Sequence, residues 1–269
     1  MTVLRHFAYK LDKSSFLNIR LWEFGINNLR RFFPWYFLFR LMVLHPVTTL
    51  RGWVTYARLV SRSKGASLCG TASDQTVLNA IAEGRRFLVA PGFCLKPYNE
   101  SLDRSTCPAG HFSHKCVLLD SGGKLLFEKK KWPQPCFSCG IPQWAQTAAR
   151  LGGDFYLMTS AIDIARDVYL PALQRHGARY GFFLLCPYST EPFTFGLAMS
   201  GMSGCLYTFC SGGCATHEEW TKADRGEKRA QTRLADDHIA PLLDALKTLP
   251  SVINVSFDYR NHVYHCSFD

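Results

Sequence analysis

The chain has 269 residues, of which 47% are hydrophobic and 14% aromatic, a composition that excludes an intrinsically disordered protein and suffices for one large domain. Its net charge of +10 is concentrated in residues 1–65, which hold 11 basic residues against only Asp12 and Glu23. There are 11 cysteines, and the first residues lack a secretory leader pattern. We therefore expect a reducing cytoplasm, where clustered cysteines more often bind metal or do redox chemistry than form disulfides.

Residues 1–65 are predicted to form a basic, aromatic-rich amphipathic helical arm, followed by a cysteine-rich α/β domain at residues 66–269. Arginines interrupt the apolar side chains between residues 16 and 44, and the longest charge-free run before Arg40 is Phe32–Phe39, which contains Pro34. A membrane-spanning helix needs about 20 apolar residues, so we expect none in this arm.

Two interpretations of the arm remain open. The favoured one is a helix that packs on the body of the protein or on a partner subunit. The other is an amphipathic helix that lies on an anionic membrane surface through residues 16–64, which would place a cytoplasmic protein at the inner face of the membrane. The density of large apolar residues argues against a nucleic-acid arm, because a segment that tracks phosphates needs few buried phenylalanines.

The body has the pattern of an α/β fold. Short apolar runs predict buried strands at residues 86–90, 116–119, 154–158, 181–185 and 205–209. Ser160 and Asp163 resemble a capping box that opens a helix reaching about His176, with a bend at Pro171. A strand, a helix and a strand between residues 154 and 185 indicate a βαβ crossover and hence a mostly parallel sheet flanked by helices. A long helix at 230–249 and a closing pair of strands at 252–257 and 262–268 complete the prediction.

Several cysteines follow predicted strands directly. Cys94, Cys186 and Cys210 come at or just after the ends of three such runs, and Cys214 follows in the glycine-rich turn CSGGC. Ligands of an open parallel sheet gather beyond the carboxyl ends of its strands. We therefore expect these four cysteines to bind a cofactor at that edge.

A second set of cysteines is denser. Cys136 and Cys139 form a CxxC at the predicted start of a helix over residues 142–151, and a helix N-terminus favours thiolates. Together with Cys107 and Cys116 they make four candidate metal ligands, the number that suits a tetrahedral zinc ion or a four-iron cluster. His111 and His114 lie between Cys107 and Cys116 and are interpreted as ordinary loop residues. Metal ligation by either histidine is the less favoured alternative.

The remaining candidates are weaker. Cys69, Cys205 and Cys266 are interpreted as packing residues. Glu191 lies beyond a strand end and is a candidate acid or base by position. Glu218, Asp224 and Lys228 could face a substrate near a cluster, although a solvated helix start explains this polar stretch as well.

The order of these motifs resembles that of a cysteine-rich bacterial and archaeal family called domain of unknown function 116. The resemblance covers about residues 86–216, and the family often has a third cysteine two residues past its CxxCG, where Ile141-Pro142 stand here. It implies a cytoplasmic metal or iron–sulfur protein and supplies no reaction. The matching pieces are Cys94, Cys136-Phe-Ser-Cys139-Gly140, Thr159-Ser160, Cys186 and Gly213-Cys214.

Three functions compete on this evidence. The first is an iron–sulfur redox protein or oxidoreductase that exchanges electrons with a donor or partner protein. The second is a structural zinc-binding module for assembly, and zinc accounts for four cysteines but not for seven or eight. The third is a thiol–disulfide oxidoreductase that uses Cys136 and Cys139. The sequence has no phosphate-binding glycine loop, GxSxG or HExxH, so nucleotide binding, serine hydrolysis and zincin proteolysis have no support.

Overall fold

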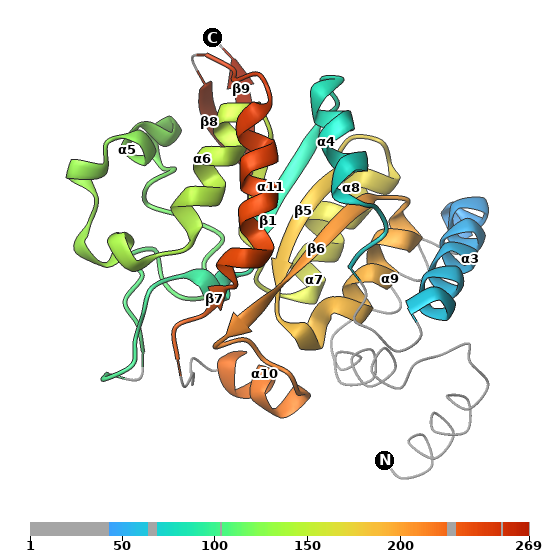
Figure 1. Ribbon diagram of the computed structural model, residues 1–269, viewed down its shortest axis with the longest axis horizontal. Helices are drawn as coiled ribbons and strands as arrows, with labels where there is room; N and C mark the ends of the chain where they lie inside the picture. The colour runs from blue at the N-terminus through green and yellow to red at the C-terminus, as the bar shows by residue number, and fades with distance from the viewer. Residues whose placement is uncertain (1–42, 64–68, 103, 225–229, 254, 269) are drawn as a thin grey trace.

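A computed structural model describes residues 43–63, 69–102, 104–224, 230–253 and 255–268. Its centre is a seven-stranded sheet in the order β7-β6-β5-β1-β4-β9-β8 (Figure 1). Neighbouring strands β6, β5, β1 and β4 are parallel, and the strands at both edges pair antiparallel. The predicted α/β class with a mostly parallel sheet is therefore confirmed. The strands are β1 (Phe87–Pro91), β4 (Asp154–Tyr156), β5 (Tyr180–Leu185), β6 (Ser203–Ser211), β7 (Arg233–Leu234), β8 (Val255–Arg260) and β9 (Val263–Phe268).

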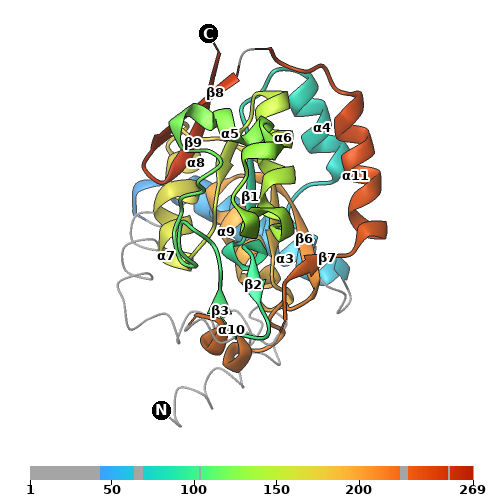
Figure 2. The ribbon, with the colours of Figure 1, turned by 90° about the vertical axis from the view of Figure 1, so that its left-hand side faces the viewer.

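Two hydrophobic layers cover the two faces of this sheet. In β1, Phe87 and Val89 point into one layer and Leu88 and Ala90 into the other, because successive strand residues face opposite sides. The first layer lies under α4 (Asp74–Ala82), α6 (Ile141–Leu151) and α11 (Asp236–Thr248). The second lies under α7 (Ala161–Ile164), a π-helical turn (Ala165–Tyr169), α8 (Leu170–Leu173) and α9 (Thr190–Ser200). Figure 2 shows α6, α4 and α11 on one side of the strands.

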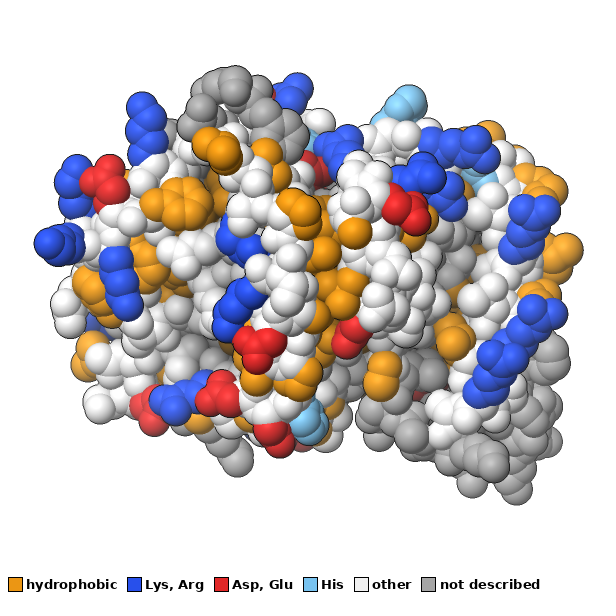
Figure 3. Space-filling view, turned by 45° about the horizontal axis from the view of Figure 1, so that its top comes forward, with side chains coloured by type: hydrophobic (Ala, Val, Ile, Leu, Met, Phe, Trp, Pro, Cys, Tyr) orange, Lys and Arg blue, Asp and Glu red, His pale blue; other side chains and the backbone are white. Residues whose placement is uncertain are grey.

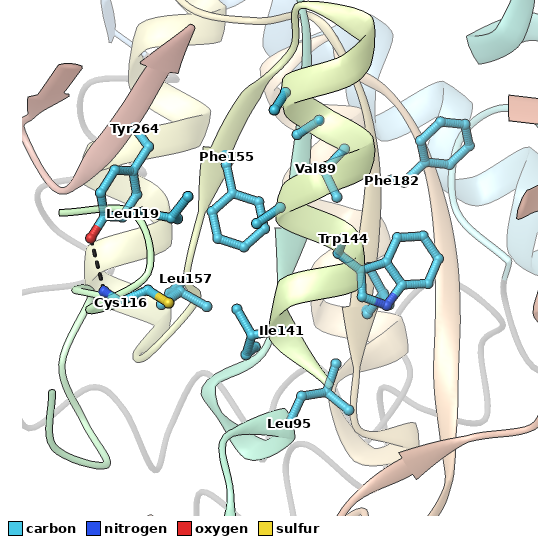
Figure 4. Packing of buried hydrophobic residues seen from close by; sticks show 14 of the residues in the cluster. Val89, Leu95, Cys116, Leu119, Ile141, Trp144, Phe155, Leu157, Phe182 and Tyr264 are labelled. Carbon is cyan, nitrogen blue, oxygen red and sulfur yellow. Dashed lines mark hydrogen bonds between the residues drawn. The ribbon is translucent and has the colours of Figure 1, made fainter. Parts of the chain in front are cut away.

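The first layer contains the largest fully buried side chain, Trp144 of α6. Phe155 of β4 and Ile141 at the start of α6 belong to the same layer, and Figure 4 shows them beside Leu95 and Cys116. The helix that carries Trp144 ends at Gly152, whose φ of 74° suits glycine because it has no Cβ. The core under α6 thus reaches to the segments that hold several cysteines.

The helix start predicted from Ser160 and Asp163 occurs, with the bond from amide to hydroxyl that a capping box contains. The Ser160 hydroxyl accepts a bond from the Asp163 amide at 3.2 Å and donates to the Asp163 carboxylate at 2.7 Å. The helix then continues through the π-helical turn to Leu173 rather than to His176. Pro171 lies just after that turn, where its missing N–H removes a helical hydrogen bond.

Two predicted elements are wrong. Residues 116–119 form a turn and not a strand, since the Leu119 amide bonds the Cys116 carbonyl at 2.9 Å and the Cys116 amide bonds the Tyr264 hydroxyl at 2.8 Å. The helix predicted over 230–249 begins only at Asp236, because Arg233–Leu234 pair with β6 as β7. Helices α4 and α9 had no counterpart in the prediction, and the chain adds a small hairpin of β2 (Tyr98–Asn99) and β3 (Arg104–Ser105), with α5 (Lys124–Phe127) and α10 (His217–Asp224).

The described part of the arm is α3 (Pro46–Ser63), while the prediction for residues 1–42 and the predicted boundary at residue 65 lie outside the described residues. Helix α3 packs on α9 through a close approach at Gly52, where an added Cβ would lie 2.6 Å from the Ala198 carbonyl oxygen. The opposite face of α3 exposes Leu50, at 67%. Basic and apolar side chains alternate at the right-hand edge of Figure 3, on the side where Figure 1 shows α3. This helix therefore packs on the body with one face and leaves the other uncovered.

Candidate metal centre

Cys94, Cys186 and Cys214 meet at one edge of the sheet, and we call them the strand-end trio. They follow β1, β5 and β6, which are neighbours in the sheet, and all three are buried. The thiol of Cys186, on the middle strand, is hydrogen-bonded to the thiols of both Cys94 and Cys214. The bond to Cys214, followed by burial, raises the pKa of Cys186 to about 12, and the bond to Cys94 opposes that shift. The three cysteines are thus brought together where parallel strands end.

Cys210 does not join this trio. It is exposed near the end of β6, and its thiol donates to the Arg233 carbonyl at 3.5 Å. Of the three cysteines predicted to pack, Cys205 is buried and Cys266 half-buried, but Cys69 is exposed, so packing was the wrong prediction for Cys69.

Cys107, Cys116, Cys136 and Cys139 form a second group, which we call the cysteine tetrad. Cys107 and Cys116 begin turns at the two ends of one loop, and Cys136 lies in a 3-10 helix (Gln134–Ser138). The Cys139 amide bonds the Cys136 carbonyl at 3.3 Å, and α6 begins two residues later, as the CxxC predicted. The tetrad therefore takes its thiols from two separate parts of the chain, residues 107–116 and residues 136–139.

The four thiols act on one another electrostatically. The charges of Cys107 and Cys136 each raise the pKa of Cys116 and that of Cys139, although burial is the largest cause in both. Such mutual effects place the four thiols in one region of the protein interior, where charges interact more strongly than in water. Burial raises the pKa of Cys116 to about 12 and also raises the pKa of Cys136 and Cys139. A backbone hydrogen bond from Ile141, at the start of α6, lowers the pKa of Cys139 as expected of a helix N-terminus, but burial outweighs it.

The spacing of the thiols bears on what they could hold. Among the described residues, no three cysteine sulfurs all lie within 4.8 Å of one another. A tetrahedral zinc ion with Zn–S bonds of ~2.3 Å brings its four sulfurs to ~3.8 Å of each other. A four-iron cluster is held by one thiolate on each of its four irons. The donors present are thiols, which are ligands of both groups.

Lys96 is a residue of this site that the sequence analysis missed. It is only 1% exposed, and its ammonium donates to the carbonyls of Gly110 at 2.7 Å and Ser113 at 2.6 Å. Both carbonyls belong to the loop between Cys107 and Cys116. Burial lowers the pKa of Lys96, and the charges of Cys107, Cys116 and Cys139 oppose that shift. The amino group thus holds the loop between Cys107 and Cys116, and three of the four tetrad thiols affect its pKa.

The segment Phe93–Leu95 joins the two cysteine groups. Cys94 belongs to the strand-end trio, and the next carbonyl, that of Leu95, accepts bonds from the Gly140 amide at 3.1 Å and the Cys139 thiol at 3.7 Å. Lys96 follows directly. This short 3-10 helix therefore carries one cysteine of the trio and contacts the tetrad at Cys139.

The two histidines of the loop have different surroundings. His111 packs its ring against Phe93 and Phe112, with centroids 4.9 and 4.8 Å apart. His114 turns away from the tetrad toward β4, and its ring stacks on His262 at 4.5 Å. His114 thus belongs to a group with His262, and His111 to an aromatic group with Phe93 and Phe112.

The structure describes the side chains of two of the four predicted acid–base residues, Glu191 and Glu218. Glu191 is buried and accepts a bond from the Tyr56 hydroxyl of α3 at 3.0 Å. Glu218 is exposed and pairs with Lys222 at 2.8 Å. The side chain of Asp224 and all of Lys228 lie outside the described residues. Glu191 thus ties α3 to α9, and its role as an acid or base stays a prediction.

Comparison of the chain with protein-family models, with curated proteins and with solved structures finds no match. The resemblance to domain of unknown function 116 therefore stays a prediction. In the part of the chain that the structure describes, no helix has both the length and the apolar character needed to cross a membrane.

Proposed function

We propose that this chain is an iron–sulfur redox protein whose cysteine tetrad holds a four-iron cluster. The observation that carries the proposal is the burial of the Lys96 ammonium, whose pKa is raised by the charges of Cys107, Cys116 and Cys139 against the larger effect of burial. A buried charge is costly unless an opposite charge balances it, and two carbonyl oxygens solvate an ammonium without neutralising it. Metal-bound thiolates supply that negative charge, whereas free thiols at neutral pH do not.

The chemistry of the donor set fits an iron–sulfur cluster. Four thiols come from two loops that close on each other, and the surrounding layer of Leu95, Ile141 and Trp144 limits the access of water. Burial and nearby charge are the factors through which a protein sets the reduction potential of a cluster. When bound, the cluster would supply one-electron chemistry; Lys96 would offset its negative charge and fix the loop between Cys107 and Cys116.

We assign the strand-end trio to the same chemistry. Three buried thiols joined by hydrogen bonds have no role in a single zinc site, and they would supply three ligands to a second cluster. Structural zinc bound by the tetrad alone is the second candidate function. A thiol–disulfide oxidoreductase has less support, because a reactive cysteine needs a lowered pKa and burial raises the pKa of both Cys136 and Cys139.

The iron, sulfide and zinc content of protein purified without oxygen tests the proposal, together with its visible spectrum. We expect a brown protein with about four irons per cluster and an absorption that dithionite bleaches. About four irons per chain would assign only the tetrad, and about eight would include the trio. A colourless protein with one zinc per chain would replace the redox function with structural zinc, and a protein without metal would remove both.

We also propose that the uncovered face of α3 contacts an anionic membrane surface. Val47, Leu50 and Val54 are exposed at helical spacing, and the helix carries three arginines and no acidic residue. Replacing Leu50 with Asp is expected to lower the fraction that sediments with phosphatidylserine-containing vesicles by about tenfold, because the apolar contact is lost. Thr55→Asp introduces the same charge at an exposed neighbouring position and serves as the control. Equal sedimentation of Leu50→Asp and the unmodified protein would rule out this contact.

A further inference from the structure

A group of metal-ligating side chains lies apart from the cysteines, and the proposed function does not use it. His114, Asp167 and His262 each offer one ligand atom, and these three atoms all lie within 4.8 Å of one another. They come from three elements: the loop that holds Cys107 and Cys116, the π-helical turn, and the turn between β8 and β9. Tertiary folding therefore brings them together, beyond the end of β4.

His114 is held as a metal-binding histidine commonly is. Its Nδ1 lies 2.8 Å from the Leu157 carbonyl, an acceptor, so Nδ1 carries the proton when the imidazole is neutral and Nε2 offers a lone pair. The Thr159 hydroxyl lies 2.9 Å from that Nε2 and also 2.9 Å from a carboxylate oxygen of Asp163. One hydroxyl proton can serve only one of these acceptors. A cation on Nε2 would leave that proton to Asp163.

Asp167 and His262 complete the group. The side chain of Asp167 is only 3% exposed and accepts a bond from Tyr156 at 3.3 Å, and its Oδ2 lies 2.9 Å from Nδ1 of His262. His262 has a φ of 65°, next to Asn261 at 49°, in a tight hairpin turn where glycine is usual at the second position. The chain thus holds His262 in an unfavourable backbone conformation, which is a feature of functional sites. The π-helical turn that carries Asp167 is a second such feature.

Arg166 supplies positive charge to the same atoms. One guanidinium nitrogen lies 2.8 Å from Nδ1 of His262 and 3.0 Å from Oδ2 of Asp167, and it also reaches Asp163 at 2.8 Å. The Arg166 side chain is 48% exposed, so it can turn toward solvent without disturbing the core. The guanidinium therefore touches two of the three ligand atoms that a metal ion would need.

We propose that His114, Asp167 and His262 form a binding site for a divalent transition-metal ion, and that Arg166 takes the place of the cation when no metal is bound. Two imidazoles and one carboxylate suit Mn²⁺, Fe²⁺ or Zn²⁺ and leave coordination positions for water or a substrate. The site goes beyond the proposed cluster and does not depend on it, because it contains no cysteine.

Titration of the full chain with MnCl₂, followed by the electron paramagnetic resonance of free Mn²⁺, tests this site. Mn²⁺ is a suitable probe because it prefers oxygen and nitrogen ligands to thiolates. We expect one bound Mn²⁺ per chain, and at least a tenfold loss of affinity in His262→Gln and in Asp167→Asn. Arg166→Gln is expected to bind roughly tenfold more tightly, because a competing positive charge is removed.

Three comparisons make the result decisive. His238→Gln, an exposed histidine on α11, should bind Mn²⁺ like the unmodified chain. Cys136→Ser with Cys139→Ser should also retain Mn²⁺, which separates this site from the cluster. His262 lies in a surface turn, so its variant tests the site even if Asp167→Asn does not fold, as circular dichroism would reveal. The proposal is overturned if neither the unmodified chain nor Arg166→Gln binds Mn²⁺, or if His262→Gln binds it unchanged.

Discussion

Replacing Cys136 and Cys139 together with serine is expected to remove the iron of the proposed tetrad cluster, with at least a tenfold fall in tetrad-bound metal per chain. The two residues supply half of the tetrad, and a serine hydroxyl is a far poorer ligand for iron or zinc than a thiolate. Their local geometry should survive, because the 3-10 turn is closed by the backbone bond from the Cys139 amide to the Cys136 carbonyl. Iron, zinc and sulfide analysis after anaerobic purification measures the effect.

The matched control for this pair is Cys266→Ser. Cys266 is a half-buried thiol on β9, outside both cysteine groups. Burial raises its pKa to about 11, as burial also raises the pKa of the tetrad thiols Cys116, Cys136 and Cys139. Its replacement should leave the metal content unchanged. If the double variant of Cys136 and Cys139 keeps its full complement of metal, then the CxxC is not a ligand pair and neither an iron–sulfur nor a zinc tetrad exists here.

Truncation of Trp144 to alanine is expected to lower the free energy of unfolding by about 3–5 kcal/mol, the usual cost of removing a buried tryptophan from a packed core. Trp144 is fully buried in the layer under α6, where Figure 4 shows it above Ile141 and Leu95. Neighbouring side chains would fill the cavity left by the indole only in part, because α6 packs on the sheet and is anchored by the turn at Gly152. Urea unfolding followed by circular dichroism gives the difference.

Gln143→Ala is the control for Trp144, since residue 143 is the exposed neighbour on the same helix. It should change stability by less than about 0.5 kcal/mol. Metal content should be measured in both variants, because α6 begins two residues after Cys139 and a loss of metal would add to the loss of packing. A Trp144→Ala protein as stable as the control would mean that the layer under α6 repacks freely.

Much of the fold could be predicted from local sequence patterns. Buried parallel strands such as Phe87–Pro91 and Tyr180–Leu185 are continuous apolar runs, because both of their faces are covered. The capping contact between Ser160 and Asp163 is equally local. The run Cys116–Leu119 is also apolar, and the strand predicted there is wrong. Its apolar side chains enter the core from a turn, which is held by a hydrogen bond from the Cys116 amide to the hydroxyl of Tyr264, 148 residues away in the chain. Hydrophobic periodicity alone cannot distinguish a buried strand from an apolar turn of this kind.

The α/β class, the positions of the main strands and the cysteines that follow strand ends could be predicted from the sequence, because each depends on residues close together in the chain. The folded structure was needed to show that Cys186 is hydrogen-bonded to Cys94 and Cys214 while Cys210 lies apart, and that the buried Lys96 ammonium binds the loop between Cys107 and Cys116. It also decided that His114 meets Asp167 and His262, which are 53 and 148 residues away in the chain. The physical reason is that charge balance and ligand geometry depend on distances in space, and chain spacing does not fix distances between separate elements.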